Sequence, residues 1–209
     1  PRNVPAASLS PSGRVARLPV LFWAYWLVVF LSVSAEWSTI FWGADFLETS
    51  VGLRKVDAAT LMSVFYGAIL LGRVLGSRLA RRIPLSILLP GAALLALGGF
   101  LPFWLAPLAP LNVTGLFVAG LGIANLFPLT LAAASGSVAP HQVDAASSRI
   151  TLAAGLAILI TPQVLGTLAD HTGIKSAYAV VGVFLGVAIA AILVANQFAQ
   201  RSVSGQNQP

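Results

Sequence analysis

Six long apolar runs fill almost the whole of this 209-residue chain, and most charged residues stand at its ends or in the short joints between the runs. Charged residues make up 9% of the chain, against about a quarter in an ordinary soluble domain, and 57% is hydrophobic. So few charges cannot cover the surface of a soluble fold of this size, whereas a bilayer is an apolar solvent that suits this composition. The sequence predicts an integral membrane protein.

The apolar runs are each long enough to cross about 30 Å of hydrocarbon as a helix. They lack the period-two alternation of a membrane β-strand. We therefore expect an all-α membrane protein, a six-transmembrane-helix bundle with spans at about 19–46, 57–79, 84–106, 111–136, 145–169 and 176–198. Helix breakers mark the joints between them: Gly52, Pro84, Pro107, Pro110, Pro140 and Gly173.

The basic residues predict the orientation of the bundle. One side receives both ends of the chain and the joints after the second and fourth spans, with Arg2, Arg14, Arg17, Arg73, Arg78, Arg81, Arg82, Arg149 and Arg201. The other side receives only Arg54, Lys55 and Lys175. Positive residues accumulate on the cytoplasmic side, so we expect both termini in the cytoplasm and the protein in the cell (inner) membrane. This bias explains the net charge of +6 without a nucleic-acid partner.

The second and fifth spans begin alike, which suggests an internal repeat. Residues 56–60 read Val-Asp-Ala-Ala-Thr and residues 143–147 read Val-Asp-Ala-Ala-Ser, with Asp57 and Asp144 each placed to cap a helix N-terminus. Ala-rich membrane sequences also produce such matches by chance. If the repeat is real, its unit is three helices, and an odd number forces the second copy to run inverted. Two inverted three-helix repeats are typical of secondary transporters.

Polar residues are concentrated in four of the six spans. The third and sixth spans hold almost none, which predicts a lipid-facing scaffold. The other four contain Ser32, Ser34, Glu36, Ser38, Thr39, Thr60, Ser63, Tyr66, Asn125, Thr130, Thr151, Thr161 and Gln163. Polar groups avoid lipid, so these four helices are expected to form a cavity wall. For any single hydroxyl, the simpler interpretation is a hydrogen bond to a carbonyl of its own helix.

Three segments resemble the C-terminal half of a major facilitator superfamily transporter. Residues 72–82, Gly-Arg-Val-Leu-Gly-Ser-Arg-Leu-Ala-Arg-Arg, resemble the second-half copy of the family's cytoplasmic loop motif without its acidic residue. Residues 162–173, from Pro162 to Gly173, resemble the proline-to-glycine pattern of the penultimate helix. Ala35 and Glu36, with Trp37 and Trp42, are similar to the fucose-permease-like branch.

The resemblance implies a fold of twelve helices in two halves, of which this chain supplies one. Residues 1–18 are then expected to be a cytoplasmic linker, 19–199 the six-helix domain and 200–209 a cytoplasmic tail, with a missing N-terminal six-helix half as partner. The implied function is alternating-access movement of a small solute, sugar-like or another metabolite, coupled to protons. The alternative within the family is drug or metabolite efflux by antiport. A channel or a structural membrane subunit is the alternative outside it.

Glu36 is the strongest candidate for chemistry, because an ionisable residue inside a span is costly and marks a functional site by default. Helix periodicity places Tyr25, Ser32 and Thr39 on the same face. Two roles remain open for Glu36, proton acceptor and ligand of a polar solute, beside a purely structural one. The full set expected to bind solute or protons is Glu36, Tyr25, Ser32, Thr39, Trp37, Tyr66, Asn125 and Gln163.

The arginines after the second span are first of all topology determinants. Arg73, Arg78, Arg81 and Arg82 are also candidates for a cytoplasmic gate closed by an acidic residue such as Asp144. Gly72 and Gly76 form a small-xxx-small pair that predicts close helix packing.

Enzyme classes find no support in the sequence. An intramembrane serine protease needs a serine in a Gly-x-Ser-Gly setting and a histidine at the same depth. Ser135 lacks that setting, and His141 and His171 lie in joints on opposite sides of the predicted bundle. Phosphate-loop, dinucleotide and metal-triad motifs are absent, and without cysteine there is no disulfide or thiolate metal site. We expect neither enzymatic activity nor a cofactor.

Overall fold

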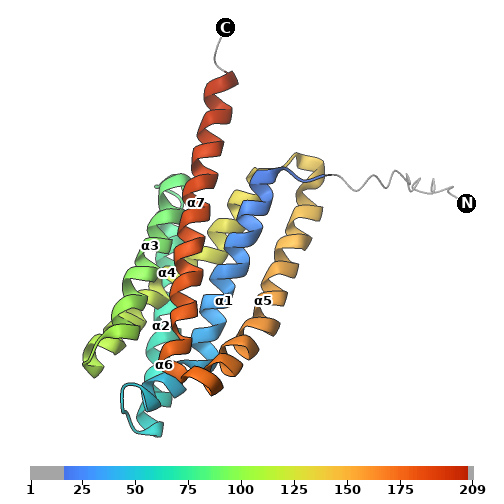
Figure 1. Ribbon diagram of the computed structural model, residues 1–209. Coiled ribbons are helices and arrows are strands. Elements are labelled where there is room, and N and C mark those ends of the chain that lie inside the picture. Colours follow the sequence, from blue (N-terminus) through green and yellow to red (C-terminus); the bar gives the residue numbers. More distant parts are fainter. Residues whose placement is uncertain (1–16, 207–209) are drawn as a thin grey trace, which may run out of the picture.

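The computed structural model describes the backbone of residues 17–206 and the side chains of residues 17–199. This range is a bundle of helices (Figure 1). The long helices are α1 (Val20–Thr49), α2 (Lys55–Leu79), α3 (Leu85–Leu105), α4 (Ala109–Gly136), α5 (Val143–Thr172) and α7 (Ala179–Gln206). Two short pieces, the 3-10 turn η1 (Pro140–Gln142) and α6 (Ile174–Ala177), precede α5 and α7.

All six predicted spans are present. Six helices of the described range are long and apolar enough to cross a membrane, the last of them running from Ile174 to Ala199 through α6 and the start of α7. The observed ends differ from the predicted ones by a few residues. α7 runs furthest beyond its prediction, continuing to Gln206. The predicted linker, residues 1–18, lies almost entirely outside the described residues, and so does the end of the predicted tail.

Glycines lie at two of the predicted joints and adopt backbone conformations that other residues avoid. Gly52 has a φ of 80° between α1 and α2, and Gly173 has a φ of 81° between α5 and α6. A residue with a Cβ rarely adopts this left-handed region of φ, so the chain ends a helix and reverses at these points.

The prediction that Asp57 and Asp144 cap helices is wrong. α2 begins at Lys55 with Arg54 in the cap position, and α5 begins at Val143 with Gln142 in that position. Both aspartates therefore lie within the first turn of their helices, where a carboxylate still interacts favourably with the positive end of the helix dipole. Asp57 also accepts a hydrogen bond from Arg54, with 2.6 Å between Nε and Oδ2. Both helices begin earlier than predicted, which explains the error.

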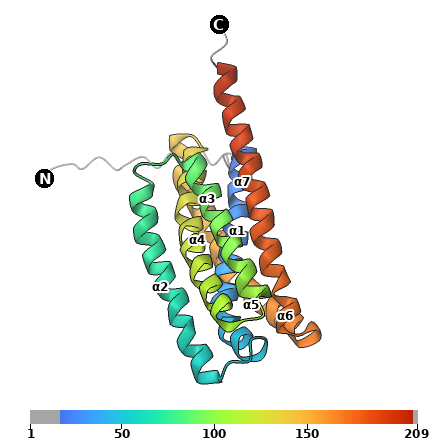
Figure 2. The ribbon, with the colours of Figure 1, turned by 90° about the vertical axis from the view of Figure 1, so that its left-hand side faces the viewer.

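The packing of the helices follows a twofold pattern. α1 packs against α5 and α7, while α4 packs against α2 and α3. The two patterns correspond if α1, α2 and α3 are matched in order with α4, α5 and α7. The α1–α5 pair is then equivalent to the α4–α2 pair, and the α1–α7 pair is equivalent to the α4–α3 pair. α1 and α4 also contact each other. Figure 2 shows α2 at one edge of the bundle, with α4 beside it. The bundle consists of two three-helix repeats, inverted with respect to each other.

The outward faces of α3 and α7 are apolar, as expected for a scaffold. Their exposed side chains include Ile87, Leu94, Leu101, Val183, Val187 and Leu193. α2 has a similar face, on which Leu70, Leu71 and Leu75 are exposed. Exposed apolar surface is thus not confined to the third helix of each repeat.

Candidate functional site

An ion pair joins Glu36 of α1 to Arg73 of α2. The carboxylate oxygen Oε1 lies 3.9 Å from the guanidinium nitrogen Nη2. The Glu36 side chain is 13% exposed, whereas that of Arg73 is 60% exposed. The other ion pair of the described residues, Arg54 with Asp57, lies at the joint before α2. In the part of the chain that the structure describes, Glu36 and Arg73 are therefore the one pair of opposite charges held between two spans.

Close packing at one end of the two helices brings α1 and α2 together. A Cβ atom at Gly43 would lie 2.8 Å from Sδ of Met62, so α2 approaches α1 where glycine leaves room. Gly43 follows Glu36 by seven residues, two turns of helix, and therefore lies on nearly the same face. The long side chain of Arg73 then reaches back from α2 toward the carboxylate.

The pair is loose and open on one side. Charge-assisted N–H···O hydrogen bonds are about 2.7–2.9 Å long, and at 3.9 Å this pair is well beyond that range. Arg73 also lines a hollow of about 520 Å³ between α2 and α4, together with Gly76, Asn125 and Pro128. Arg73 thus lies between the Glu36 carboxylate and an open hollow.

The three residues expected on the Glu36 face are buried, and two of them form hydrogen bonds within their own helix. The Ser32 hydroxyl donates to the carbonyl of Val29 at 3.2 Å, and the Thr39 hydroxyl donates to the carbonyl of Ala35 at 2.9 Å. Both therefore follow the simpler interpretation, a hydrogen bond to their own helix. Tyr25 is 6% exposed and lines a separate hollow with residues of α3, α4 and α7.

The two tryptophans next to Glu36 in the sequence have different surroundings. Trp37 is half-buried, with its ring 5.8 Å from that of Phe41. Trp42 donates a hydrogen bond of 2.9 Å from Nε1 to the carbonyl of Pro162 in α5. Its indole occupies space left by Gly166, where a Cβ would lie 2.6 Å from Cζ2. Trp37 is thus partly exposed, and among the described residues its indole forms no hydrogen bond to another helix, whereas Trp42 joins α1 to α5.

Asn125 is used to join α4 to α2. Its Nδ2 donates to the carbonyls of Gly72 and Leu121, each at 3.0 Å, and its Oδ1 lies against Gly76. The prediction that Gly72 and Gly76 permit close helix packing is confirmed. Two other predicted ligands, Tyr66 and Gln163, are exposed on α2 and α5.

The arginines at the end of α2 and the acidic residue Asp144 are not brought together. Arg78, Arg81 and Arg82 are exposed and surround a hollow of their own with Leu79. Asp144 is exposed at the start of α5, and neither of the two ion pairs among the described residues includes it. Among the described residues, the structure thus shows no ion pair between these arginines and Asp144.

Sequence reasoning missed the partnership of Arg73 with Glu36 because it grouped Arg73 with the arginines of the joint. A signal was present: Arg73 lies six residues before the end of α2, well inside a span. An arginine at such a position needs a partner. Glu36 is the one acidic residue near the middle of another span.

A second missed contact lies between α1 and α5. The hydroxyls of Ser34 and Thr161, both buried, are 2.8 Å apart. Neither residue belongs to a motif that predicts the other.

Six apolar helices in two inverted repeats, with an ion pair between two spans, define a multi-pass membrane protein. Residues 25–208 match the model of the Major Facilitator Superfamily. The chain belongs to this family of transporters, and its resemblance to it is confirmed.

Two curated relatives are also transporters. An uncharacterized transporter, y4wD, of Sinorhizobium fredii is 27% identical over 80% of this chain and 44% of its own length. An uncharacterized MFS-type transporter of Yersinia pestis is 28% identical over 75% of this chain and 40% of its own length. The chain thus spans less than half the length of either relative.

Solved transporters share the fold at low sequence identity. A peptide transporter, POT, in complex with alafosfalin superposes with a TM-score of 0.77 at 16% identity, over 84% of this chain and 38% of its own. The Escherichia coli fucose:proton symporter FucP gives a TM-score of 0.74 at 18% identity, over 87% and 44%. In each case the matched segment is less than half of the solved transporter's own length.

Proposed function

We propose that this chain is the C-terminal half of a secondary transporter that moves a small polar solute by alternating access and couples the movement to protons. The proposal rests on the Glu36–Arg73 ion pair between α1 and α2. Support for a partner half comes from the relatives and solved transporters, which are more than twice as long as the matched segment. The asymmetry of the basic residues supports two cytoplasmic termini in the inner membrane.

The coupling follows from the geometry of the pair. When Glu36 is ionised, it attracts Arg73 across 3.9 Å. When Glu36 takes up a proton, the attraction ends and the exposed guanidinium is free to bind a solute or to move with α2. If protonation of Glu36 changes the affinity for a solute, bound solute changes the affinity of Glu36 for a proton by the same factor. This reciprocity is the thermodynamic requirement for coupling. Trp37 and the hollow beside Arg73 offer an apolar surface and space for that solute.

The test is Glu36→Gln in the whole transporter, reconstituted in proteoliposomes with a pH-sensitive dye inside. Sugars and other small metabolites are added one at a time, and both luminal pH and solute counterflow are recorded. Glutamine keeps the size and hydrogen bonding of the side chain but cannot ionise. We expect solute-driven proton movement to disappear while solute counterflow persists.

Glu48→Gln is the matched control, since Glu48 lies on the same helix near its end. This variant should retain both activities. Undiminished proton movement in the Glu36→Gln variant would contradict the proposal and place the proton site elsewhere. Loss of counterflow with normal pH dependence would instead make Glu36 a solute ligand. The sign of the pH change in the unaltered protein distinguishes symport from antiport.

A further inference from the structure

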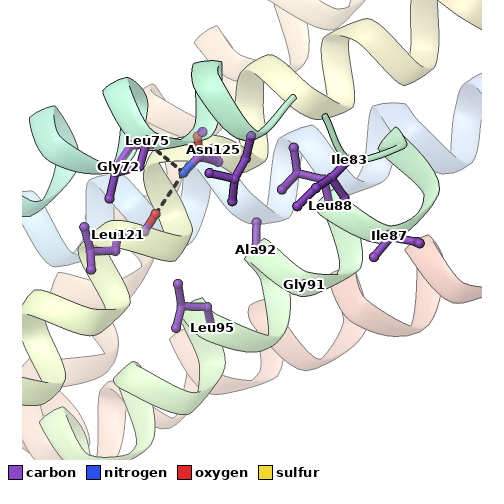
Figure 3. A pocket seen from close by; sticks show the side chains of 12 residues that line it. Gly72, Leu75, Ile83, Ile87, Leu88, Gly91, Ala92, Leu95, Leu121 and Asn125 are labelled. Carbon is purple, nitrogen blue, oxygen red and sulfur yellow. Dashed lines mark hydrogen bonds between the residues drawn. The ribbon is translucent and has the colours of Figure 1, made fainter. Parts of the chain in front are cut away.

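An apolar crevice separates α2 from α3, although the two helices follow each other in the chain. Each of them packs on α4 instead. Gly72 lets α2 approach the backbone of Leu121, and Gly99 lets α3 approach the backbone of Ala119. The crevice between the two helices has a volume of about 400 Å³, with α4 as its floor (Figure 3).

The lining of the crevice suits an apolar occupant. It holds no charged side chain, and Asn125 is its one polar side chain. Both hydrogen bonds drawn from the Asn125 amide in Figure 3 end on helix carbonyls, those of Gly72 and Leu121. Gly91 stands in the wall of α3, and a Cβ added there would meet nothing within 4 Å. The space is therefore open, and no polar group in it calls for a polar ligand.

The depth of the crevice corresponds to one leaflet of a bilayer. On α3 its lining positions extend from Ile87 to Leu95, and at 1.5 Å per residue they span about 12 Å. A hydrocarbon core of about 30 Å gives each leaflet about 15 Å. One acyl chain of a phospholipid thus matches the crevice in length as well as in polarity.

Positive charge stands at the mouth of the crevice. Arg78, Arg81 and Arg82 surround a second hollow with Leu79, and Leu79 also lines the crevice, so the two spaces adjoin. None of the three arginines belongs to an ion pair of the described residues. Clusters of basic residues at the cytoplasmic end of membrane helices bind anionic lipid headgroups.

We propose that the α2–α3 crevice, together with Arg78, Arg81 and Arg82, is a binding site for one anionic phospholipid. An acyl chain lies along Leu95, Gly91 and Ile87, and the phosphate contacts the arginines. This site is separate from Glu36 and does not depend on the transport mechanism. Its occupant would hold α2 against α3 where the protein itself provides few contacts.

The experiment is native mass spectrometry of the whole transporter with equal amounts of dioleoylphosphatidylglycerol and dioleoylphosphatidylcholine. We expect a preference for phosphatidylglycerol on the order of tenfold. Combined Arg78→Gln, Arg81→Gln and Arg82→Gln should abolish this preference, whereas lysine at the same three positions should keep it. The lysine variant separates loss of charge from a fault in membrane insertion.

Gly91→Leu fills the crevice and should reduce bound lipid at least fivefold. Gly98→Leu is the matched control, because Gly98 is an equally open glycine two turns further along α3 and outside the crevice. Equal retention of the two lipids by the unaltered protein would overturn the proposal, as would equal loss in both leucine variants. A photoreactive residue at Leu95 that links to protein rather than lipid would overturn it too, by making a second copy or another segment the occupant.

Discussion

The α1–α5 and α4–α2 crossings occupy equivalent places in the two repeats, yet different chemistry holds each together. Side-chain hydrogen bonds join α1 to α5: Trp26 to the carbonyl of Arg149, Trp42 to the carbonyl of Pro162, and Ser34 with Thr161. Glycines join α4 to α2, supplemented by the amide of Asn125. Lipid removes the hydrophobic drive between helices, so close packing and interhelical hydrogen bonds must supply the association.

The two repeats thus share the arrangement of their helices but differ in the contacts that hold the helices together. At the α4–α2 crossing, a Cβ added at Gly72 meets the backbone of Leu121, and one added at Gly76 meets the side chain of Asn125. At the α1–α5 crossing, the indoles of Trp26 and Trp42 instead donate hydrogen bonds to backbone carbonyls of α5. The first crossing is therefore expected to be intolerant of added volume, and the second to lose stability in small steps.

The largest effect is expected for Gly72→Val. A Cβ at Gly72 would lie 2.8 Å from the carbonyl oxygen of Leu121, a backbone atom that cannot turn aside. Overpacking typically costs about 1–3 kcal/mol, and here we expect about 3 kcal/mol because backbone must move. Gly67→Val is the control on the same helix, where a Cβ would meet nothing within 4 Å. Thermal unfolding in detergent measures both, and equal losses would contradict the close-packed crossing.

An intermediate effect is expected for Gly76→Ala, whose Cβ would collide with the amide of Asn125. The obstacle is a side chain, so its removal should relieve the clash. We expect Gly76→Ala to destabilise by about 2 kcal/mol, and the double variant with Asn125→Ala to recover part of that loss. The same thermal assay gives the coupling between the two positions. Strict additivity would show that Asn125 is not what requires glycine at position 76.

The smallest effect is expected at the other crossing, for the hydroxyl pair of Ser34 and Thr161. A double-mutant cycle with Ser34→Ala and Thr161→Ala should give a coupling of about 0.6 kcal/mol, the average for hydrogen bonds between membrane helices. Ser34 is 0% exposed and Thr161 is 3% exposed, so little water replaces the lost partner. A coupling of 2 kcal/mol or more would mean that the two crossings do not differ as described.

The sequence predicted the bundle well because each membrane helix can be recognised from its own residues alone. Length and apolar composition identify each span without knowledge of its neighbours. The joints at Gly52 and Gly173 followed from the same local logic, as did the close approach at Gly72 and Gly76. The two helix caps failed because a cap depends on where the helix begins, and that boundary moved by two residues at each site.

The candidate site was harder to predict, because its residues come from different helices. The periodicity of α1 placed Ser32 and Thr39 on the face of Glu36, but it could not show that both hydroxyls bond to their own helix. It also could not show that the Asn125 amide donates a hydrogen bond to the backbone carbonyl of Gly72 in α2. In each case a polar side chain expected to face a cavity had a closer partner within the bundle.

By itself the sequence determined a membrane protein with six helical spans, the charge asymmetry from which its orientation is predicted, and Glu36 as an acidic residue inside a span. The tertiary structure decided that Arg73 is the partner of that residue and that α2 and α3 leave a crevice between them. The physical reason is that helix periodicity fixes which residues share a face, whereas the rotation and crossing of helices fix which faces meet. Those depend on contacts such as Gly43 with Met62 and Gly72 with Leu121, which form only when the helices pack.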